Sequence, residues 1–194
     1  LLDFSKLDWP NKTIAMQKHW IGKSEGSTVY FDLDNSNEKI EVFTTRPDTL
    51  FGATYIVLAP EHELLGQIKD EEKKIDVENY VNQSLKKNEM QRTELNKDKT
   101  GVFTGLYAIN PVSKEKVPVW VGDYVLITYG AGAIMAVPGH DERDYQFAIK
   151  YDLPISKVVD GEGADLSESA YCDNGVAVNS GFIDGLKTKE EATN

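Results

Sequence analysis

Residues 102–137 read VFTGLYAINPVSKEKVPVWVGDYVLITYGAGAIMAV, and this stretch decides the fold class. Its apolar residues are largely β-branched or aromatic and occur in short runs separated by Gly, Pro, Asn and Asp, a pattern typical of strands joined by turns. We predict strands at residues 102–109, 117–121, 124–128 and 134–137. Asp141 follows the last of these and suits a helix N-cap, so a helix is predicted from there to about residue 151.

The rest of the chain continues this alternation of strands and helices. Ile40 and Val42 alternate with polar neighbours, so one face of their strand is predicted to be buried. In chain order we predict a helix start at residues 8–10, a strand at 28–33, a turn at 34–37, a strand at 38–44, a loop at 46–48, a β-rich run at 53–59, a polar and helical stretch at 60–99, and an exposed loop at 160–174.

Many short strands with interspersed helices indicate an α+β fold. We predict a small β-barrel-like core of short, mostly antiparallel strands, closed or nearly closed, decorated by helices. A chain of 194 residues is expected to form one globular domain, residues 1–194.

The net charge of −11 argues against a protein that holds long nucleic acid through counterion release alone. A local contact is still compatible with it. A modest basic patch occurs within fourteen residues: Lys86, Lys87, Arg92, Lys97 and Lys99. Composition favours a solvated helix face and loop for this patch, and contact with a nucleic acid is the alternative.

Other features narrow the class of protein further. The sequence has no apolar stretch of 18 residues and begins without a basic segment followed by an apolar one, so we expect no membrane span and no secretory signal. Cys172 is the single cysteine, which suits a reducing cytosol and excludes an internal disulfide. His19, His62 and His140 lack ligand spacing, so we expect no metal site.

The first candidate segment is TTRPDT at residues 44–49, where hydroxyls and charges crowd between two strands. One interpretation is a strand end and turn, in which Pro presets φ and the Asp and Thr side chains satisfy turn amides. The other is that the clustered hydroxyls bond a sugar or orient a water molecule.

The second candidate segment is GAGAIMAVPGHDERD at residues 130–144. Its glycines would let a ligand approach the backbone closely, although the apolar run between them also reads as an ordinary buried strand. Asp144 stands three residues after Asp141 and could return a bond to the cap amide, a variant of the capping box.

Helical geometry argues that Asp144 does more than cap. At about 100° per residue, Asp144 lies on the same helical face as Phe147, Ala148 and Tyr151. A carboxylate on an apolar face requires a cationic partner or several donors, which the helix N-terminus and a ligand ammonium would supply. His140 is the weaker candidate, because a structural histidine is the simpler interpretation. The sequence contains no serine-hydrolase elbow, Walker A loop or GxGxxG motif.

These two segments closely resemble the two signature segments of the editing insertion in leucyl-tRNA synthetases. The resemblance continues through residues 9–26 (WPNKTIAMQKHWIGKSEG), 100–121 and 179–186 (NSGFIDGL), and so covers nearly the whole chain. The isoleucyl and valyl enzymes share the two segments more loosely, and WIGKSEG at residues 20–26 favours the leucyl branch. Ala131 departs from the leucyl pattern, which more often has a small hydroxyl residue there.

The resemblance implies an aminoacyl-tRNA ester hydrolase of the cytoplasm. Discrimination by one methylene yields only about 1–3 kcal/mol, so a second site that hydrolyses norvalyl- or isoleucyl-tRNA while refusing leucine is needed. The implied partners are the mischarged 3′ end of tRNA-Leu and the rest of a parent synthetase, with residues 1–22 and 185–194 as the linker-proximal ends of an insertion. The HIGH and KMSKS segments that use ATP are absent, so we expect neither aminoacylation nor any cofactor in this domain.

The resemblance also implies roles for individual residues. Asp144 accepts the α-ammonium of the aminoacyl group, and Thr44 and Thr45 bond the terminal ribose or the attacking water. Arg46 approaches a phosphate or the tRNA end. The remaining substrate-binding set comprises the specificity wall Thr49, Met135 and Val137, the pocket-lining Tyr129 and Ile134, and Asp48, His140 and Asp141.

Two other functions remain open at this point. The domain could be a non-catalytic module that only holds the tRNA acceptor end, which predicts tRNA contact without ester cleavage. Alternatively, Asp141, Asp144 and His140 could serve an unrelated acid–base hydrolase, which predicts activity on esters without a nucleic-acid part.

Overall fold

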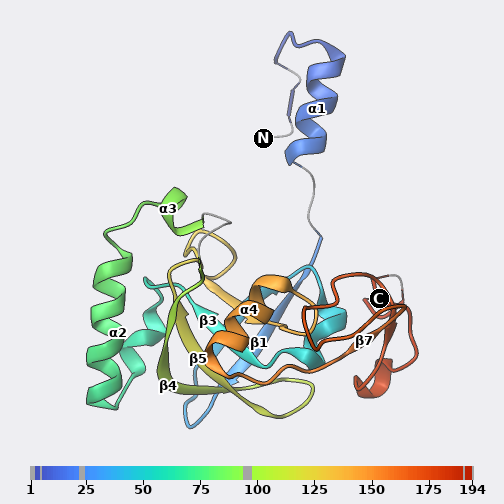
Figure 1. The fold of residues 1–194 in the computed structure, drawn as a ribbon. Helices are drawn as coiled ribbons and strands as arrows, with labels where there is room; N and C mark the ends of the chain where they lie inside the picture. Colours follow the sequence, from blue (N-terminus) through green and yellow to red (C-terminus); the bar gives the residue numbers. More distant parts are fainter. Residues whose placement is uncertain (1–2, 5, 22–24, 94–97, 190, 194) are drawn as a thin grey trace.

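The computed structural model describes residues 3–4, 6–21, 25–93, 98–189 and 191–193 (Figure 1). The elements are α1 (Asn11–Ile21), β1 (Ser27–Leu33), β2 (Lys39–Thr44), η1 (Pro47–Gly52), β3 (Tyr55–Leu58), η2 (Glu63–Gln67), α2 (Glu71–Ser84), α3 (Glu89–Thr93), β4 (Gly101–Ile109), β5 (Lys116–Gly122), β6 (Ala133–Ala136), α4 (Glu142–Tyr151), β7 (Val159–Asp160), β8 (Val176–Ala177) and η3 (Gly181–Ile183).

Six strands form one sheet in the order β2-β1-β4-β5-β3-β6. All neighbouring pairs are antiparallel except β3 and β5, which run parallel with Ile56 opposite Val119. The combination of helices with a mostly antiparallel sheet is therefore as predicted. The predicted barrel is not confirmed, because the edge strands β2 and β6 lie against each other without a ladder of hydrogen bonds that would close the sheet.

The inner face of this curved sheet encloses the largest apolar core. The alternation predicted for β2 is confirmed, since Ile40 and Val42 are fully buried while their neighbours Lys39 and Glu41 are exposed. The two buried side chains pack with Phe31 of β1 and with residues of the central strands β3 and β5.

Two helices cover the outer faces of the sheet. α2 packs on β4 through Val77, which lies in a second cluster with Val121. α4 packs on β3 and β5 through Phe147 and Ala148, and Phe147 stacks on Tyr55 at a ring separation of 5.3 Å. Figure 1 shows α4 in front of the sheet, α2 at its side, and α1 apart from both.

One predicted strand is wrong. Residues 124–128 form turns between β5 and β6 rather than a strand. The Arg92 side chain occupies backbone carbonyls that would otherwise accept hydrogen bonds from a neighbouring strand. Its Nε donates to the Asp123 carbonyl at 2.7 Å and its Nη2 to the Val125 carbonyl at 2.8 Å. The predicted exposed loop at 160–174 is largely confirmed, although it is flanked by the unpredicted short pair of β7 and β8.

The glycines of the second candidate segment serve the packing of the chain itself. Gly132 has a φ of +74°, and a Cβ there would collide with the Ile127 side chain. A Cβ on Gly139 would collide with the Ser156 carbonyl oxygen. At these two positions the close approach that the sequence predicted for a ligand is made by the protein's own atoms.

No helix in the described part of the chain is long and apolar enough to cross a bilayer.

Candidate active site

The two candidate segments meet at one small pocket of about 160 Å³. Sheet geometry brings them together, because η1 follows the edge strand β2 while β6, the opposite edge strand, leads into α4. The close approach of β2 and β6 then places both segments on the same side of the sheet. The pocket is lined by nine residues, all of them predicted from the sequence: Thr44, Thr45, Arg46, Thr49, Met135, Val137, His140, Asp141 and Asp144.

Larger hollows exist elsewhere in the described part of the chain. One of about 420 Å³ lies between η2 and α2, and one of about 310 Å³ lies beside the turn after β1. Neither is lined by a residue from segments 44–49 or 130–144. We therefore centre the candidate site on the smaller pocket, where the hydroxyls and the buried carboxylate converge.

The threonines of the first segment differ in how they are bonded. The Thr44 hydroxyl accepts from the Arg46 N–H at 3.0 Å, and the Thr49 hydroxyl donates to the Arg46 carbonyl at 3.0 Å. Both bonds are of the local kind that the turn interpretation predicted. The Thr45 side chain is exposed, and no described residue bonds its hydroxyl. Thr45 is therefore the hydroxyl in this segment that is available to a ligand.

Arg46 is held by Asp48. Its Nε lies 2.9 Å from Oδ1 and its Nη2 lies 2.8 Å from Oδ2 of a carboxylate that is fully buried. Such a two-pronged arrangement is the geometry that Arg and a carboxylate prefer. Asp48 does not line the pocket, and it acts through Arg46, whose side chain is 21% exposed at the pocket wall.

Asp144 lies at the inner wall of the pocket, near the N-terminus of α4. Its Oδ2 accepts a hydrogen bond of 2.8 Å from the Val137 N–H, and no described residue bonds Oδ1. Burial raises the pKa of the Asp144 carboxyl to about 7, and the nearby charge of Asp141 raises it as well, while the Val137 N–H and Arg143 act in the opposite direction. A carboxylate in this environment is stabilised by a bound cation.

Asp141 is the N-cap of α4, as predicted. Its Oδ1 accepts from the backbone N–H groups of Arg143 and Asp144 at 2.9 and 3.2 Å. The predicted return bond from Asp144 to the cap amide is wrong, because the Asp141 N–H donates instead to the Val137 carbonyl. The Asp144 carboxylate is thus directed towards β6 and the pocket rather than towards the cap.

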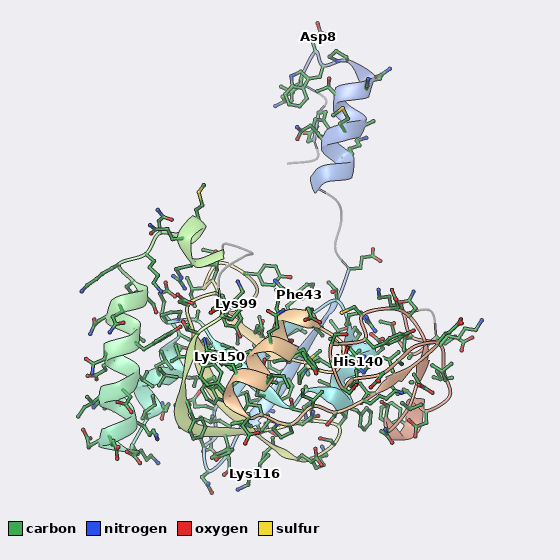
Figure 2. The ribbon with its side chains drawn as sticks, in the orientation of Figure 1. Asp8, Phe43, Lys99, Lys116, His140 and Lys150 are labelled. Atoms are coloured by element: carbon green, nitrogen blue, oxygen red, sulfur yellow. The ribbon has the colours of Figure 1, made fainter. Side chains whose placement is uncertain are left out.

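His140 has both ring nitrogens engaged by the protein. Nδ1 lies 2.8 Å from the Tyr171 carbonyl, and Nε2 accepts from the N–H groups of Val158 and Val159 at 2.9 and 3.0 Å. Burial lowers the pKa of the imidazole, so the neutral ring donates from Nδ1 and accepts at Nε2. Figure 2 shows His140 beside the C-terminal segment that it anchors. It lines the pocket without a nitrogen available for acid–base work.

A second pocket, of about 330 Å³, adjoins the first through Asp144, which lines both. Tyr129 and Ile134 lie here rather than in the smaller pocket, together with Val125 and Leu126. Four of the lining residues were not singled out in the sequence as site residues: Tyr124, Val125, Leu126 and Arg143. Tyr124 was missed because it was assigned to a strand, although the Gly-Asp pair before it already favoured a turn.

The residues of the basic patch differ in burial and in their partners. Arg92 is buried and forms an ion pair of 2.6 Å with Glu61, and Lys87 forms one of 2.6 Å with Asp123. Lys86 is exposed. Lys99 lies with its ammonium 5.6 Å from the Tyr124 ring centroid, and Figure 2 labels it close to Lys150, whose ammonium bonds the Lys99 carbonyl. Lys97 lies outside the described residues.

The described residues contain no group of three or more His, Cys, Asp or Glu side chains that could hold a metal ion.

The fold and the pocket define a small mixed α/β domain whose candidate site contains a buried carboxylate and three threonines. Its residues 18–194 match the family model described as leucyl-tRNA synthetase, editing domain, and the chain belongs to this family. The structure is similar to a crystal structure of the ternary complex of Agrobacterium radiobacter K84 agnB2 LeuRS with tRNA and LeuAMS, with a TM-score of 0.68 and 39% sequence identity. That match covers 81% of this chain and 19% of the other, so the chain spans about a fifth of that protein.

Proposed function

We propose that this domain hydrolyses the ester bond of mischarged tRNA-Leu, with norvaline, isoleucine or a similar amino acid attached, and that it excludes leucine. Membership of the editing-domain family and the similarity to a synthetase solved with tRNA support this function. The fraction of that larger protein that is matched also supports an insertion within a longer synthetase, to which the present chain would contribute editing and not aminoacylation.

The observation that carries the proposal is the buried Asp144 carboxylate with Oδ1 available at the pocket wall. The α-ammonium of an aminoacyl ester is the cation that this oxygen would bind, through a charge-assisted hydrogen bond. Binding of the ammonium would lower the pKa of Asp144 from about 7, so that the carboxylate stays ionised beside the cation. A free tRNA end, which lacks the ammonium, would not gain this interaction.

The remaining residues of the pocket would orient the ester around this anchor. The Thr45 hydroxyl, which is unbonded within the described chain, is placed to bond the terminal ribose or the attacking water. Thr44 would support it, and Thr49, Met135 and Val137 would form the wall beside the amino acid side chain. Arg46, at the same wall, would approach the phosphate of the terminal nucleotide.

Hydrolysis would add water across the ester, releasing the free amino acid and the terminal ribose hydroxyl. His140 has no free nitrogen and Asp144 would be held by the ammonium, so neither would act as a strong general base. Most of the rate would then come from positioning and from hydrogen bonds to the developing oxyanion, with a ribose hydroxyl assisting.

The proposal is tested by incubating the chain with norvalyl-, isoleucyl- and leucyl-tRNA-Leu and measuring the aminoacyl-tRNA that remains. We expect loss of the first two and retention of the third. Binding of all three without cleavage would indicate a module that only holds the acceptor end. Equal cleavage of an aminoacyl ester without a nucleic-acid part would indicate an unrelated hydrolase, an assignment that the engaged nitrogens of His140 disfavour.

A further inference from the structure

The Tyr124 hydroxyl is buried without a hydrogen-bond partner. Among the described residues it shares this property with Thr54 Oγ1 and Trp120 Nε1, and neither of these lines a pocket that contains Asp144. Tyr124 does line such a pocket. Buried hydroxyls in native proteins nearly always have a partner, so an orphan in a pocket wall indicates a ligand or a bound water.

The loop that carries Tyr124 is held rigidly. Arg92 bonds the carbonyls on both sides of it, at Asp123 and Val125, and the Tyr80 hydroxyl accepts from the Asp123 N–H at 3.0 Å. The Tyr124 ring lies edge-on to Phe147 at a centroid separation of 6.0 Å. Because its backbone and ring are both fixed, the Tyr124 hydroxyl cannot turn out to solvent without breaking these contacts.

Asp144 is the acidic group in the same pocket, and its Oδ1 is unbonded within the described chain. Burial raises the pKa of the Tyr124 hydroxyl well above its usual range, and the negative charge of Asp144 is the next largest cause. The phenol therefore stays protonated at neutral pH and has a hydrogen to donate. Both residues line this pocket, whose volume of about 330 Å³ is sufficient for bound water.

We propose that Tyr124 is a positioning residue for Asp144, with its hydroxyl donating through one bound water in the second pocket to the Asp144 Oδ1. The inference rests on the proposed function, in which Asp144 accepts the substrate ammonium. An ionised carboxylate oxygen has acceptor sites for both partners, so the water and the ammonium can bind together. The water would hold the carboxylate in one orientation and favour its ionised form.

Most of the other polar groups around Asp144 have partners of their own. On its own helix Asp141 caps the backbone and Arg143 lies 3.5 Å from Asp141. From β3 the Tyr55 hydroxyl donates to the Asp144 backbone carbonyl at 3.0 Å. At the pocket wall Arg46 is paired with Asp48, and both nitrogens of His140 are engaged. The Thr45 and Tyr129 side chains also lack a hydrogen-bond partner among the described residues but are exposed, so Tyr124 carries the buried donor without an acceptor.

The direct test is a titration of the Asp144 carboxyl carbon by nuclear magnetic resonance in the whole chain, without substrate. Tyr124→Phe removes the hydroxyl and keeps the ring. We expect the pKa of Asp144 to rise by about one unit, because a hydrogen bond to the charged form is lost. Tyr145→Phe is the matched control, since that hydroxyl on α4 donates to the Leu166 carbonyl and lines neither pocket, and it should leave the titration unchanged.

An unchanged Asp144 titration in Tyr124→Phe, with a higher melting temperature, would overturn the proposal. That result is expected of a hydroxyl that is merely buried and unsatisfied, whose removal stabilises the fold. A shifted titration that also appears in Tyr145→Phe would overturn it as well, since any lost tyrosine hydroxyl would then suffice.

The pH profile of norvalyl-tRNA hydrolysis is the second measurement. If ionised Asp144 binds the ammonium, a pKa raised by one unit lowers kcat/KM about tenfold at pH 6 and leaves it nearly unchanged at pH 9. A uniform loss across the pH range would contradict the proposed positioning role. If the chain hydrolyses no ester at all, the proposed function fails. The titration without substrate still shows whether the Tyr124 hydroxyl affects the pKa of Asp144.

Discussion

The Val137 N–H donates a hydrogen bond of 2.8 Å to Oδ2 of Asp144, and so ties the residue that follows β6 to the first turn of α4. This bond occupies one carboxylate oxygen and leaves the other, Oδ1, without a partner among the described residues. The same contact orders the wall of the pocket, because Val137 itself lines it. The position of the proposed ammonium acceptor is therefore set by the sheet rather than by the helix cap.

Replacement of Asp144 by Asn should abolish editing while the domain stays folded. Asn keeps an oxygen that can accept from the Val137 N–H but has no charge for the ammonium. The loss of one partner from a buried charge pair costs about 2–5 kcal/mol, so hydrolysis of norvalyl-tRNA should fall roughly 30- to several-thousand-fold. Glu142→Gln, two residues before Asp144 in the same helix and exposed, is the control that should retain activity. Near-normal hydrolysis by folded Asp144→Asn would reject the assignment.

The same substitution should stabilise the fold in a pH-dependent way. The pKa of Asp144 is raised from an ordinary 3.8 to about 7, so the folded chain retains a proton that the unfolded chain has lost. The contribution of this group to the free energy of unfolding therefore falls as pH rises from about 4 to 7 and is constant above, a loss of at most about 4 kcal/mol. Asp144→Asn should match the wild type in urea unfolding at pH 4 and exceed it at pH 8. A constant difference across this range would contradict the raised pKa.

Arg46 should prove important for stability before any effect on tRNA is considered. Arg46→Ala leaves the fully buried Asp48 carboxylate without its cation, which typically costs about 3–5 kcal/mol. The double variant Arg46→Ala/Asp48→Asn removes both charges and should recover much of the melting temperature. If Arg46 also contacts the tRNA end, this double variant should bind tRNA more weakly while its hydrolysis of a short aminoacyl-adenosine mimic is less affected. Equal losses on both substrates would place Arg46 at the reacting ester.

Arg92 should behave as a structural residue and Lys86 as a surface residue, although the sequence grouped them in one patch. Arg92→Lys cannot reproduce the bonds to Glu61 and to the Asp123 and Val125 carbonyls, so we expect a loss of about 2–4 kcal/mol in the free energy of unfolding. Lys86→Gln should leave stability unchanged and weaken tRNA binding at low salt. Unfolding curves and filter binding measure the two effects, and an unaltered Arg92→Lys melting temperature would contradict the structural role.

The sequence predicted the strands whose pattern is local and missed the features that depend on distant partners. β2 was found because Ile40 and Val42 alternate with polar residues over a buried face. Residues 124–128 carry the same β-branched and aromatic composition, but Arg92, some thirty residues away, binds the carbonyls there. Closure of a barrel likewise depends on the register of β2 against β6, which no single segment encodes.

In the candidate site too, local features were predicted from the sequence and contacts between distant elements were not. The two segments were identified from their residue types, and the structure brings nine of the predicted residues into one pocket. The local bonds of Thr44, Thr49 and Asp141 agree with the predicted turn and helix cap, but the bonds that join different elements could not be predicted. Asp144 was expected to bond its own helix cap and instead bonds the end of β6. Asp48 was expected to contact the substrate and is buried behind Arg46.

Thr49 should decide which amino acids the pocket accepts. Its side chain is almost completely buried, and its hydroxyl donates to the Arg46 carbonyl, which together with the branched Cβ restricts χ1 and fixes the methyl group. Leucine differs from norvaline by a branch at Cγ, and a fixed methyl at the wall is a simple means of excluding it. Thr49→Ala should therefore permit hydrolysis of leucyl-tRNA, and Thr49→Phe should block the erroneous substrates too.

Two smaller substitutions at Thr49 test the role of the methyl group and the role of the hydroxyl separately. Thr49→Ser keeps the bond to the Arg46 carbonyl and removes the methyl, so it should admit leucine as Thr49→Ala does. Thr49→Val keeps the branched shape and loses the bond, so it should lower the melting temperature and continue to refuse leucine. Deacylation of leucyl- and isoleucyl-tRNA by the four variants and the wild type, measured side by side, tests this. If folded Thr49→Ala and Thr49→Ser both refuse leucine, the excluding wall lies elsewhere in the pocket, and Met135, which is half-buried on the opposite segment, becomes the residue to replace.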